Sequence, residues 1–129
     1  RTKTTNRYFN NIYVRMGAHT LIHKRTEDDI WKNLFELPLV ETEKDLSEEE
    51  FLACPQFHAL FAEGEVRMVR TLLRGVKHVL SHRVIYTNFY EVTLPDNSSS
   101  FSSYQRVAVE DLGRYAVPRL IHAFLEKYV

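Results

Sequence analysis

The residues best suited to chemistry are Ser81, His82 and Arg83, which supply a hydroxyl, an imidazole and a guanidinium in succession. They interrupt the stretch KHVLSHRVIYTNFYEVTLP at residues 77–95, which is rich in Val, Ile, Tyr and Phe and is typical of two β-strands. The interruption contains none of the Gly, Pro, Asn or Asp residues that build most short turns. The residue types therefore mark an unusual strand connection that carries hydrogen-bonding and charged groups.

The charged residues are distributed unevenly along a chain whose formal net charge is zero. Residues 1–25 carry six basic and no acidic side chains, whereas residues 26–65 carry twelve acidic and two basic ones. Residues 66–129 carry nine basic and five acidic side chains, and the charged residues within 66–83 are all basic: Arg67, Arg70, Arg74, Lys77 and Arg83. This separation predicts either a cationic surface that approaches phosphates or an ordinary solvated acidic face beside ordinary basic surface.

Two histidine pairs have a spacing that ligates metal ions on a helix, His19 with His23 and His78 with His82. Both pairs lie in strand-like segments without a third ligand nearby, so we expect ordinary surface or core histidines and no metal site. The acidic run at residues 41–50 predicts a solvated first helical turn, because acid–base catalysis needs carboxylates with a shifted pKa in a cleft. Without a glycine-rich phosphate loop or a nucleophile–base pair, the motifs predict a non-catalytic domain.

The length of 129 residues, 44% of them hydrophobic, corresponds to one domain with its own core. The single Cys54 excludes a disulfide framework and an iron–sulfur site within this chain. No apolar run approaches the roughly 18 residues of a membrane span. The chain opens with RTKTTNRYF, without an initiating Met or a signal peptide. We therefore expect residues 1–6 to be the remnant of an interdomain linker and residues 7–129 to form the domain.

The elements that position these residues are expected to be strands and helices in alternation. Enrichment in β-branched and aromatic residues predicts strands at 7–15, 18–25, 75–82, 83–92 and 104–111. Gly17 predicts a hairpin turn between the first two, and the Ser-rich stretch 95–103 predicts an internal loop. The segment VRMVRTLL at 66–73 is ambiguous between helix and strand.

Two helical segments flank the predicted strands. Ser47 and Glu50 form a capping-box pattern, so a helix is expected from about residue 48, interrupted at Pro55 and ending near Gly64. A terminal helix is predicted by one apolar stripe, which consists of Val117, Leu120, Ile121, Phe124, Leu125 and Tyr128. The order of elements predicts an α+β domain with a mixed β-sheet flanked by helices.

Longer motifs resemble a known family. IWKNLFELPLVE (30–41), which follows YVRMGAHTLIHKR, resembles the gLWeFP region of Nudix-fold domains. VLSHRVIYTNFYEV (79–92) resembles the signature region of the C-terminal domain of A/G-specific adenine DNA glycosylases, the MutY family, and YAVPRLIHAFLEKY (115–128) is similar to the family's C-terminal end. The resemblance covers residues 7–129 and implies a Nudix-like domain that recognises 8-oxoguanine opposite adenine in double-stranded DNA.

The resemblance also implies roles for single residues. The family's Phe-Ser-His loop, which contacts the oxidised guanine, falls on Leu80, Ser81 and His82. Oxidation turns the N7 atom of guanine from an acceptor into a donor, and the Ser81 hydroxyl can accept from it. Leu80 is a departure from the family, because it keeps an apolar wedge but lacks an aromatic face. The candidates for contacts with the DNA backbone are Arg74, Lys77 and Arg83.

In this family a separate domain carries the catalysis. The resemblance implies that a helical N-terminal domain with an iron–sulfur cluster removes the extruded adenine. That domain is absent from this chain, so the chain alone is expected to be non-catalytic and to hold neither metal nor cofactor. The implied partners are DNA with an 8-oxoguanine:adenine mispair and the catalytic domain in cis, without a membrane. The implied location is the bacterial cytoplasm, in association with the nucleoid.

Two other functions stay open at this point. A metal-dependent Nudix pyrophosphatase would need the pattern Gly-x₅-Glu-x₇-Arg-Glu-x₂-Glu-Glu to hold its metal. Here Leu39 and Val40 replace the glycines after Pro38, and residues 48–50 are glutamates without the preceding Arg-Glu pair, which argues against hydrolysis. A Nudix-like domain could also be a protein-interaction scaffold that uses its aromatic strands and terminal helix.

Overall fold

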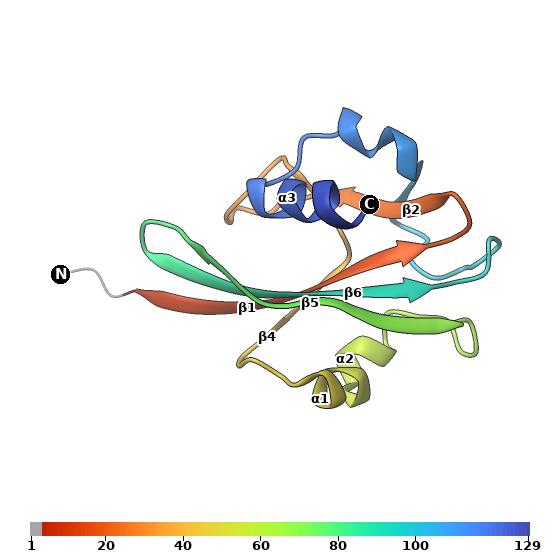
Figure 1. Ribbon diagram of the computed structural model, residues 1–129, viewed down its shortest axis with the longest axis horizontal. Coiled ribbons are helices and arrows are strands. Elements are labelled where there is room, and N and C mark those ends of the chain that lie inside the picture. The colour runs from red at the N-terminus through yellow and green to blue at the C-terminus, as the bar shows by residue number, and fades with distance from the viewer. Residues whose placement is uncertain (1–3) are drawn as a thin grey trace.

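A computed structural model describes residues 4–129, in which a four-stranded sheet carries helices on both faces (Figure 1). The elements in chain order are β1 (Thr5–Arg15), β2 (His19–Lys24), β3 (Phe35–Glu36), β4 (Leu39–Thr42), α1 (Glu48–Ala53), α2 (Pro55–His58), β5 (Met68–Val79), β6 (Arg83–Thr93), β7 (Gln105–Ala108), the 3₁₀ helix η1 (Val109–Arg114) and α3 (Arg119–Tyr128). The main sheet has the order β4-β1-β6-β5, and a second sheet has the order β3-β2-β7. The predicted α+β class, with a mixed sheet flanked by helices, is confirmed.

The centre of the main sheet is the parallel pairing of β1 with β6, which runs from Thr5 opposite Arg83 to Arg15 opposite Thr93. β4 and β5 add antiparallel strands on the two outer sides. Residues 9–14 of β1 and 87–92 of β6 are continuously buried, as expected for strands with both faces covered. Since parallel strands need a long crossover, the chain between β1 and β6 carries β2 to β5 and the helices α1 and α2.

Successive residues of the central strands enter two separate hydrophobic clusters, because side chains alternate between the faces of a sheet. On one face Phe89 of β6 stacks on Phe124 of α3, with ring centroids 4.0 Å apart. On the other face Tyr90 stacks on Phe51 of α1, with centroids 4.7 Å apart. We call these the α3-side cluster and the α1-side cluster.

Both predicted helical regions form, but the first ends at His58 and not near Gly64, and α3 begins at Arg119, after Val117 of the predicted stripe. Ser47 accepts a hydrogen bond from the backbone N–H of Glu50, whose carboxylate accepts one from the N–H of Ser47, so the capping box is complete. Pro55 divides this region into the short helices α1 and α2. The apolar stripe of α3 faces the sheet, with Leu120, Ile121 and Phe124 buried in it. Within residues 4–129, no helix is long and apolar enough to cross a bilayer.

The predicted hairpin of residues 7–15 and 18–25 forms only at its turn. Gly17 adopts the expected positive φ of 60°, and Met16 and His19 form one isolated antiparallel bridge. Beyond this bridge β2 leaves β1 and pairs with β3 and β7 in the second sheet. The physical reason is that β4 and β6 already occupy both edges of β1.

The bounds of three strands differ from the sequence-based expectation. β1 begins at Thr5, within the predicted linker remnant, of which residues 1–3 lie outside the described residues. The ambiguous segment 66–73 contributes to β5, which continues through Gly75 at φ 70° with register shifts on either side of Leu73. The strand predicted at 104–111 ends at Ala108, and the chain continues as η1.

The Ser-rich stretch is the predicted loop, and one carboxylate organises it. Glu65 accepts hydrogen bonds from the hydroxyls of Ser98, Ser99 and Ser100 and from the backbone N–H of Ser99. Stabilisation of the carboxylate by the hydroxyls of Ser98 and Ser100 lowers the pKa of Glu65 to about 2. The loop is therefore tied to the segment that precedes β5.

Truncation of the stacked core ring tests the packing of α3 on the sheet. Phe124→Ala is expected to lower the free energy of unfolding by about 3–5 kcal/mol, because a ring is lost from a buried cluster. Urea denaturation monitored by circular dichroism measures this change. Leu125→Ala, at a half-buried position on the same helix, should lower the free energy of unfolding clearly less. Equal losses in the two variants would contradict the stacking of Phe124 in the core.

Candidate nucleic-acid interface

The tip of the β5–β6 hairpin is the connection that carries Leu80, Ser81 and His82. The backbone N–H of Leu80 donates to the carbonyl of Arg83 at 2.8 Å and closes the turn without glycine. The side chains of Ser81, His82 and Arg83 are exposed, whereas Leu80 is half-buried and packs on the α3-side cluster. The structure thus presents the hydroxyl and imidazole to solvent and anchors the apolar residue beside them.

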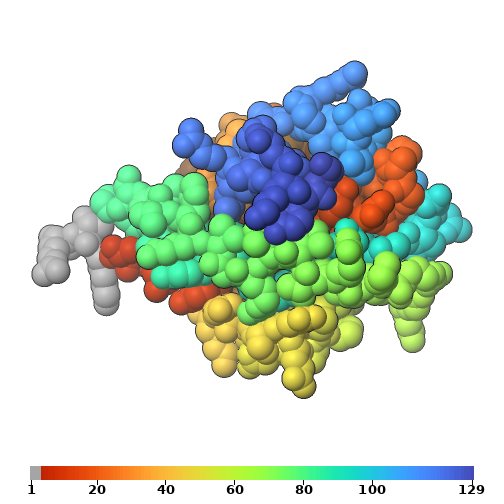
Figure 2. All heavy atoms as spheres, in the orientation of Figure 1, coloured from red at the N-terminus to blue at the C-terminus, as the bar shows by residue number. Residues whose placement is uncertain are grey.

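The hairpin tip lies beside the start of β1. The backbone N–H of Thr5 donates to the carbonyl of His82 at 3.0 Å, and the Thr5 hydroxyl donates to the same oxygen at 3.4 Å. Figure 2 shows the tip, in green to teal, next to the red start of β1 at one end of the molecule, with α3 and α1 set back from it. β1 therefore begins next to the connection that carries Ser81 and His82.

The three candidates for DNA-backbone contacts have different environments. Arg74 donates to the Tyr90 hydroxyl at 2.7 Å and to the carbonyl of Leu46 at 2.9 Å, and it lies 3.7 Å from the Asp45 carboxylate. Its guanidinium therefore connects β5 to the segment before α1. Lys77 and Arg83 are exposed, and no ion pair joins either of them to a carboxylate within residues 4–129.

Part of the basic run at residues 66–83 is neutralised. Arg70 donates two hydrogen bonds of 3.1 Å to the carboxylate of Glu91, directly opposite it in the β5–β6 pairing. The paired carboxylate raises the pKa of Arg70. With Arg74 also bound to protein groups, the basic residues of the run without an ion pair to a carboxylate in the described part of the chain are Lys77 and Arg83 at the tip end of the hairpin and Arg67 before β5, which donates to the Gly64 carbonyl.

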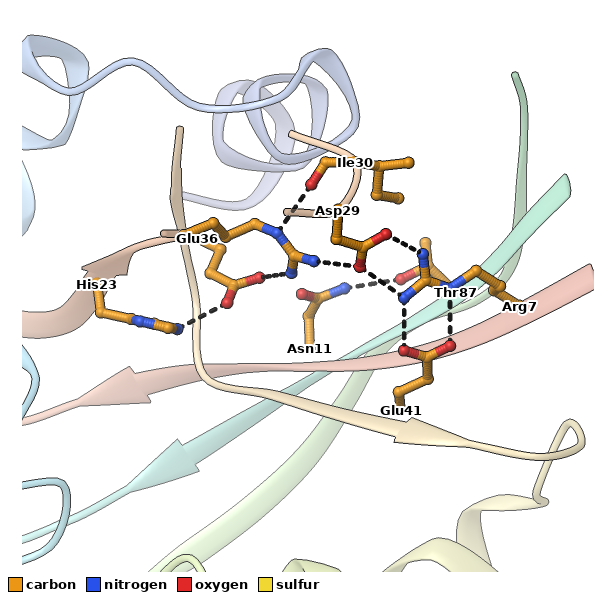
Figure 3. Close-up of polar contacts among 9 residues, drawn as sticks. Arg7, Asn11, His23, Asp29, Ile30, Glu36, Glu41 and Thr87 are labelled. Carbon is orange, nitrogen blue, oxygen red and sulfur yellow. Dashed lines mark hydrogen bonds and ion pairs between the residues drawn. The ribbon is translucent and has the colours of Figure 1, made fainter. Parts of the chain in front are cut away.

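A polar network not predicted from the sequence lies on the face of the sheet that α3 covers (Figure 3). Arg7 of β1 makes a bidentate pair with Asp29 at 2.8 and 2.9 Å, and a second with Glu41 of β4 at 2.8 and 2.7 Å. Arg25 bonds to Asp29 at 3.0 Å and to Glu36 at 2.6 Å. The network fastens the loop between β2 and β3 to β1 and β4.

The carboxylate of Asp29 is stabilised in its charged form within this network. The hydrogen bonds from Arg7 lower the pKa of Asp29 to about 2, and the two carboxylates raise the pKa of Arg7. Glu36 additionally lies 2.6 Å from the Nε2 atom of His23. These carboxylates have a structural role, because arginine side chains, and His23 at Glu36, occupy their oxygen atoms. The only sequence signal was the clustering of basic residues before 26 and acidic residues after it.

The histidine pairs are not gathered into a metal site. His23 contacts Glu36, and His78 lies beside the ring of Trp31 with centroids 6.0 Å apart, while His82 is exposed at the tip. Across residues 4–129 no three His, Cys, Asp or Glu side chains are grouped so that they could hold a metal ion. The residues present are thus unlike the donor set that a metal centre uses.

Comparison with known proteins shows the family of this chain. The family model described as the NUDIX domain matches residues 12–127, which include all elements from β2 to η1. The chain belongs to the NUDIX family. A sequence search of curated proteins gave no significant match.

Solved structures similar to this NUDIX domain include a MUTYH domain and MutT proteins. The C-terminal domain of mouse MUTYH, in a complex with human PCNA, has a TM-score of 0.73 and 14% identity, over 95% of this chain and 86% of that one. A MutT protein described from Aliivibrio salmonicida and Vibrio cholerae has a TM-score of 0.64 and 16% identity, over 95% of both chains. MutT from Methanosarcina mazei Go1 has a TM-score of 0.61 and 16% identity, over 98% of this chain and 95% of that one. At these identities the likeness shows the fold alone.

The glutamates of α1 occupy the region where the sequence departs from the hydrolase pattern. Glu48, Glu49 and Glu50 are exposed in the first turn, and Glu50 is used in the capping box. Its hydrogen bonds from Ser47 lower the pKa of Glu50. The predicted solvated first helical turn is thus confirmed for residues 48–50, whereas Glu41 of the same acidic run lies on β4 and pairs with Arg7.

The pH dependence of stability tests the Arg7–Asp29 pair. The folded carboxyl has a pKa of about 2 against an ordinary 3.8, so its stabilisation is complete above about pH 4 and is lost as the pH falls through 2. Asp29→Asn should therefore lower the free energy of unfolding at pH 7 by about 1 kcal/mol, a value reduced for solvent screening. Urea denaturation between pH 2 and 7 should show this difference disappearing towards pH 2.

The matched control for this pair is Asp28→Asn, because Asp28 is exposed one residue earlier in the same loop. The control should change the free energy of unfolding little at any pH. A difference between wild type and Asp29→Asn that stays constant from pH 7 to pH 2 would refute the assignment of the pKa to this pair.

Proposed function

We propose that this NUDIX domain is the lesion-recognition domain of an adenine DNA glycosylase, which contacts 8-oxoguanine opposite the adenine to be removed. The observation that carries the proposal is the hairpin tip, where Ser81 and His82 are exposed beside Lys77 and Arg83. A hydroxyl next to unpaired cations can meet a base edge while the cations meet phosphates. Phosphate contacts orient the domain, and the base contact provides the discrimination.

The Ser81 hydroxyl is suited to the oxidised base. Guanine offers N7 as an acceptor, whereas 8-oxoguanine offers an N7–H donor and an additional carbonyl, so at the N7 position a hydroxyl oxygen can accept a hydrogen bond only from the oxidised form. Leu80 supports the tip by packing on the α3-side cluster. In this proposal His82 meets a phosphate or holds the loop, and its carbonyl binds the start of β1 through Thr5.

The position of the tip supports cooperation with a catalytic domain in cis. Because Thr5 bonds to His82, a domain preceding β1 would enter next to the recognition loop. Such a domain, carrying the iron–sulfur cluster, could act on the adenine while the tip contacts the opposite base of the same pair. The NUDIX domain would then contribute recognition, not bond cleavage.

Two alternatives predict different outcomes. A NUDIX hydrolase would release phosphate or pyrophosphate from nucleotides with Mg²⁺, and similarity to the MutT structures is the reason to test it. A protein-interaction domain would bind a partner without DNA, and similarity to the mouse MUTYH domain, which forms a complex with human PCNA, is the reason to test that. The tip geometry favours DNA recognition, because it exposes a hydroxyl and an imidazole together with two cations.

Substitution of Ser81 in the full-length protein tests the lesion assignment. Ser81→Ala should lower the preference for excision of adenine opposite 8-oxoguanine over guanine by roughly fivefold, since one neutral hydrogen bond contributes about 1 kcal/mol. Single-turnover excision on the two duplexes measures the preference. Ser103→Ala, at an exposed serine of the 95–103 loop, is the control and should leave it unchanged. Equal effects on both duplexes, or adenine release by this domain alone, would overturn the proposal.

The salt dependence of DNA binding distinguishes the exposed Lys77 from Arg74, which is bound to groups within the domain. Lys77→Ala should weaken binding to undamaged duplex and lower the slope of log affinity against log salt by about one, because one phosphate contact is lost. Arg74→Ala should leave the slope unchanged while lowering stability, because Arg74 bonds to Tyr90 and Leu46. Fluorescence anisotropy at several salt concentrations measures both. An equal loss of slope in Arg74→Ala would argue against this division.

A further inference from the structure

Two tyrosine rings of the main sheet pack on each other outside both hydrophobic clusters. Tyr8 of β1 and Tyr86 of β6 are direct neighbours in the parallel pairing, and their rings stack with centroids 5.5 Å apart and planes 16° apart. Neither residue belongs to the α3-side or the α1-side cluster, and both are half-buried. The pair therefore presents aromatic surface that the core of the domain does not use.

Residues of β5 and β6 extend this surface to the hairpin tip. Lys77 lies opposite Tyr86, and Val79 lies opposite Val84 one row closer to the tip. Val79 is 66% exposed, which is high for an apolar strand residue. Because alternate residues of a strand share one face, these side chains form a continuous patch. We call it the tyrosine platform, and its members are Tyr8, Lys77, Val79, Val84 and Tyr86.

The helices leave the tyrosine platform open. Figure 1 shows α1 and α2 beneath the part of the sheet away from the hairpin tip. The one charge of the platform is that of Lys77, which no carboxylate pairs within residues 4–129. The two rings cover one face of each other and leave their remaining half-buried surface at the sheet. An aromatic pair with an unpaired cation beside it suits a ligand that combines a planar group with negative charge.

We propose that the tyrosine platform binds an unstacked base of a DNA strand, with Lys77 contacting the adjacent phosphate. This inference rests on the proposed function, because it gives the same hairpin a second contact with DNA. Every base has a π-face, so stacking on Tyr8 or Tyr86 is independent of sequence and contributes roughly tenfold in affinity per base. The tip would then read the lesion while the platform holds a strand that has been opened nearby.

Charge and position favour DNA over a protein at this platform. Tyrosines are common in protein interfaces, but lysine is depleted from the centres of such interfaces. Lys77 lies in the same row as the two tyrosines, directly opposite Tyr86. The platform also continues into the exposed tip with Ser81 and His82, where a contact with DNA is already proposed.

Binding of a fluorescein-labelled 12-mer oligothymidylate tests the platform. In anisotropy titrations the double variant Tyr8→Leu with Tyr86→Leu should bind at least tenfold more weakly than wild type, because leucine has no π-face. Tyr8→Phe with Tyr86→Phe keeps the rings and should stay within about twofold of wild type. Tyr128→Leu is the matched control, since Tyr128 also has a lysine at its ring but lies on α3. Thermal unfolding verifies that each variant is folded.

Photocrosslinking locates the contact independently of folding. The wild-type domain, irradiated with an oligonucleotide that contains 5-iododeoxyuridine, should yield crosslinked peptides that include Tyr8 or Tyr86. Crosslinks confined to other residues, or unchanged affinity in the leucine variant, would overturn the inference. So would loss of self-association or of protein binding in that variant without any loss of oligothymidylate binding.

The test of the tyrosine platform can succeed or fail independently of the test of lesion recognition by Ser81. Oligothymidylate contains no oxidised guanine, so its binding measures the platform without the lesion contact. If Ser81→Ala leaves excision preference unchanged while the leucine variant loses oligothymidylate binding, only lesion recognition fails. If Ser81→Ala changes the preference and the leucine variant binds normally, only the platform fails.

Discussion

The parallel pairing of β1 with β6 is the constraint on which the rest of the structure depends. Two parallel strands in the middle of a sheet must be covered on both faces, and the chain that connects them must cross over. The crossover supplies α1 and α2 to one face, and the end of the chain supplies α3 to the other. Because β4 and β5 complete the two sides of this pair, β2 is forced into a second sheet.

The same pairing brings the start of the domain to the connection that carries Ser81 and His82. β1 and β6 begin together, so Thr5 meets His82 and the connection before β6 lies beside the N-terminal end of β1. It also places Tyr8 against Tyr86. One strand register thus determines where the tip hydroxyl and the tyrosine pair lie. It also determines where any preceding domain would approach.

Electrostatic pairing decides which charges remain available for a ligand. Arg7 and Arg25 pair with Asp29, Glu36 and Glu41. Arg70 and Arg74 also bind groups within the domain. Arginine suits such bidentate roles because its donors form a planar fork. Lys77 and the exposed end of β6 are left as the cationic part of the hairpin. A neutral chain can in this way expose a local positive surface.

The sequence by itself determined the α+β class, the capping box of α1, the buried stripe of α3 and most element types, because periodicity and capping depend on residues close together in the chain. It left residues 66–73 ambiguous and did not predict η1. It also located the loop that carries Ser81. Only the tertiary structure decided the partner of β2, the engagement of Arg74 and the meeting of Tyr8 with Tyr86. These depend on strand register and side-chain pairing between distant segments, which no local pattern encodes.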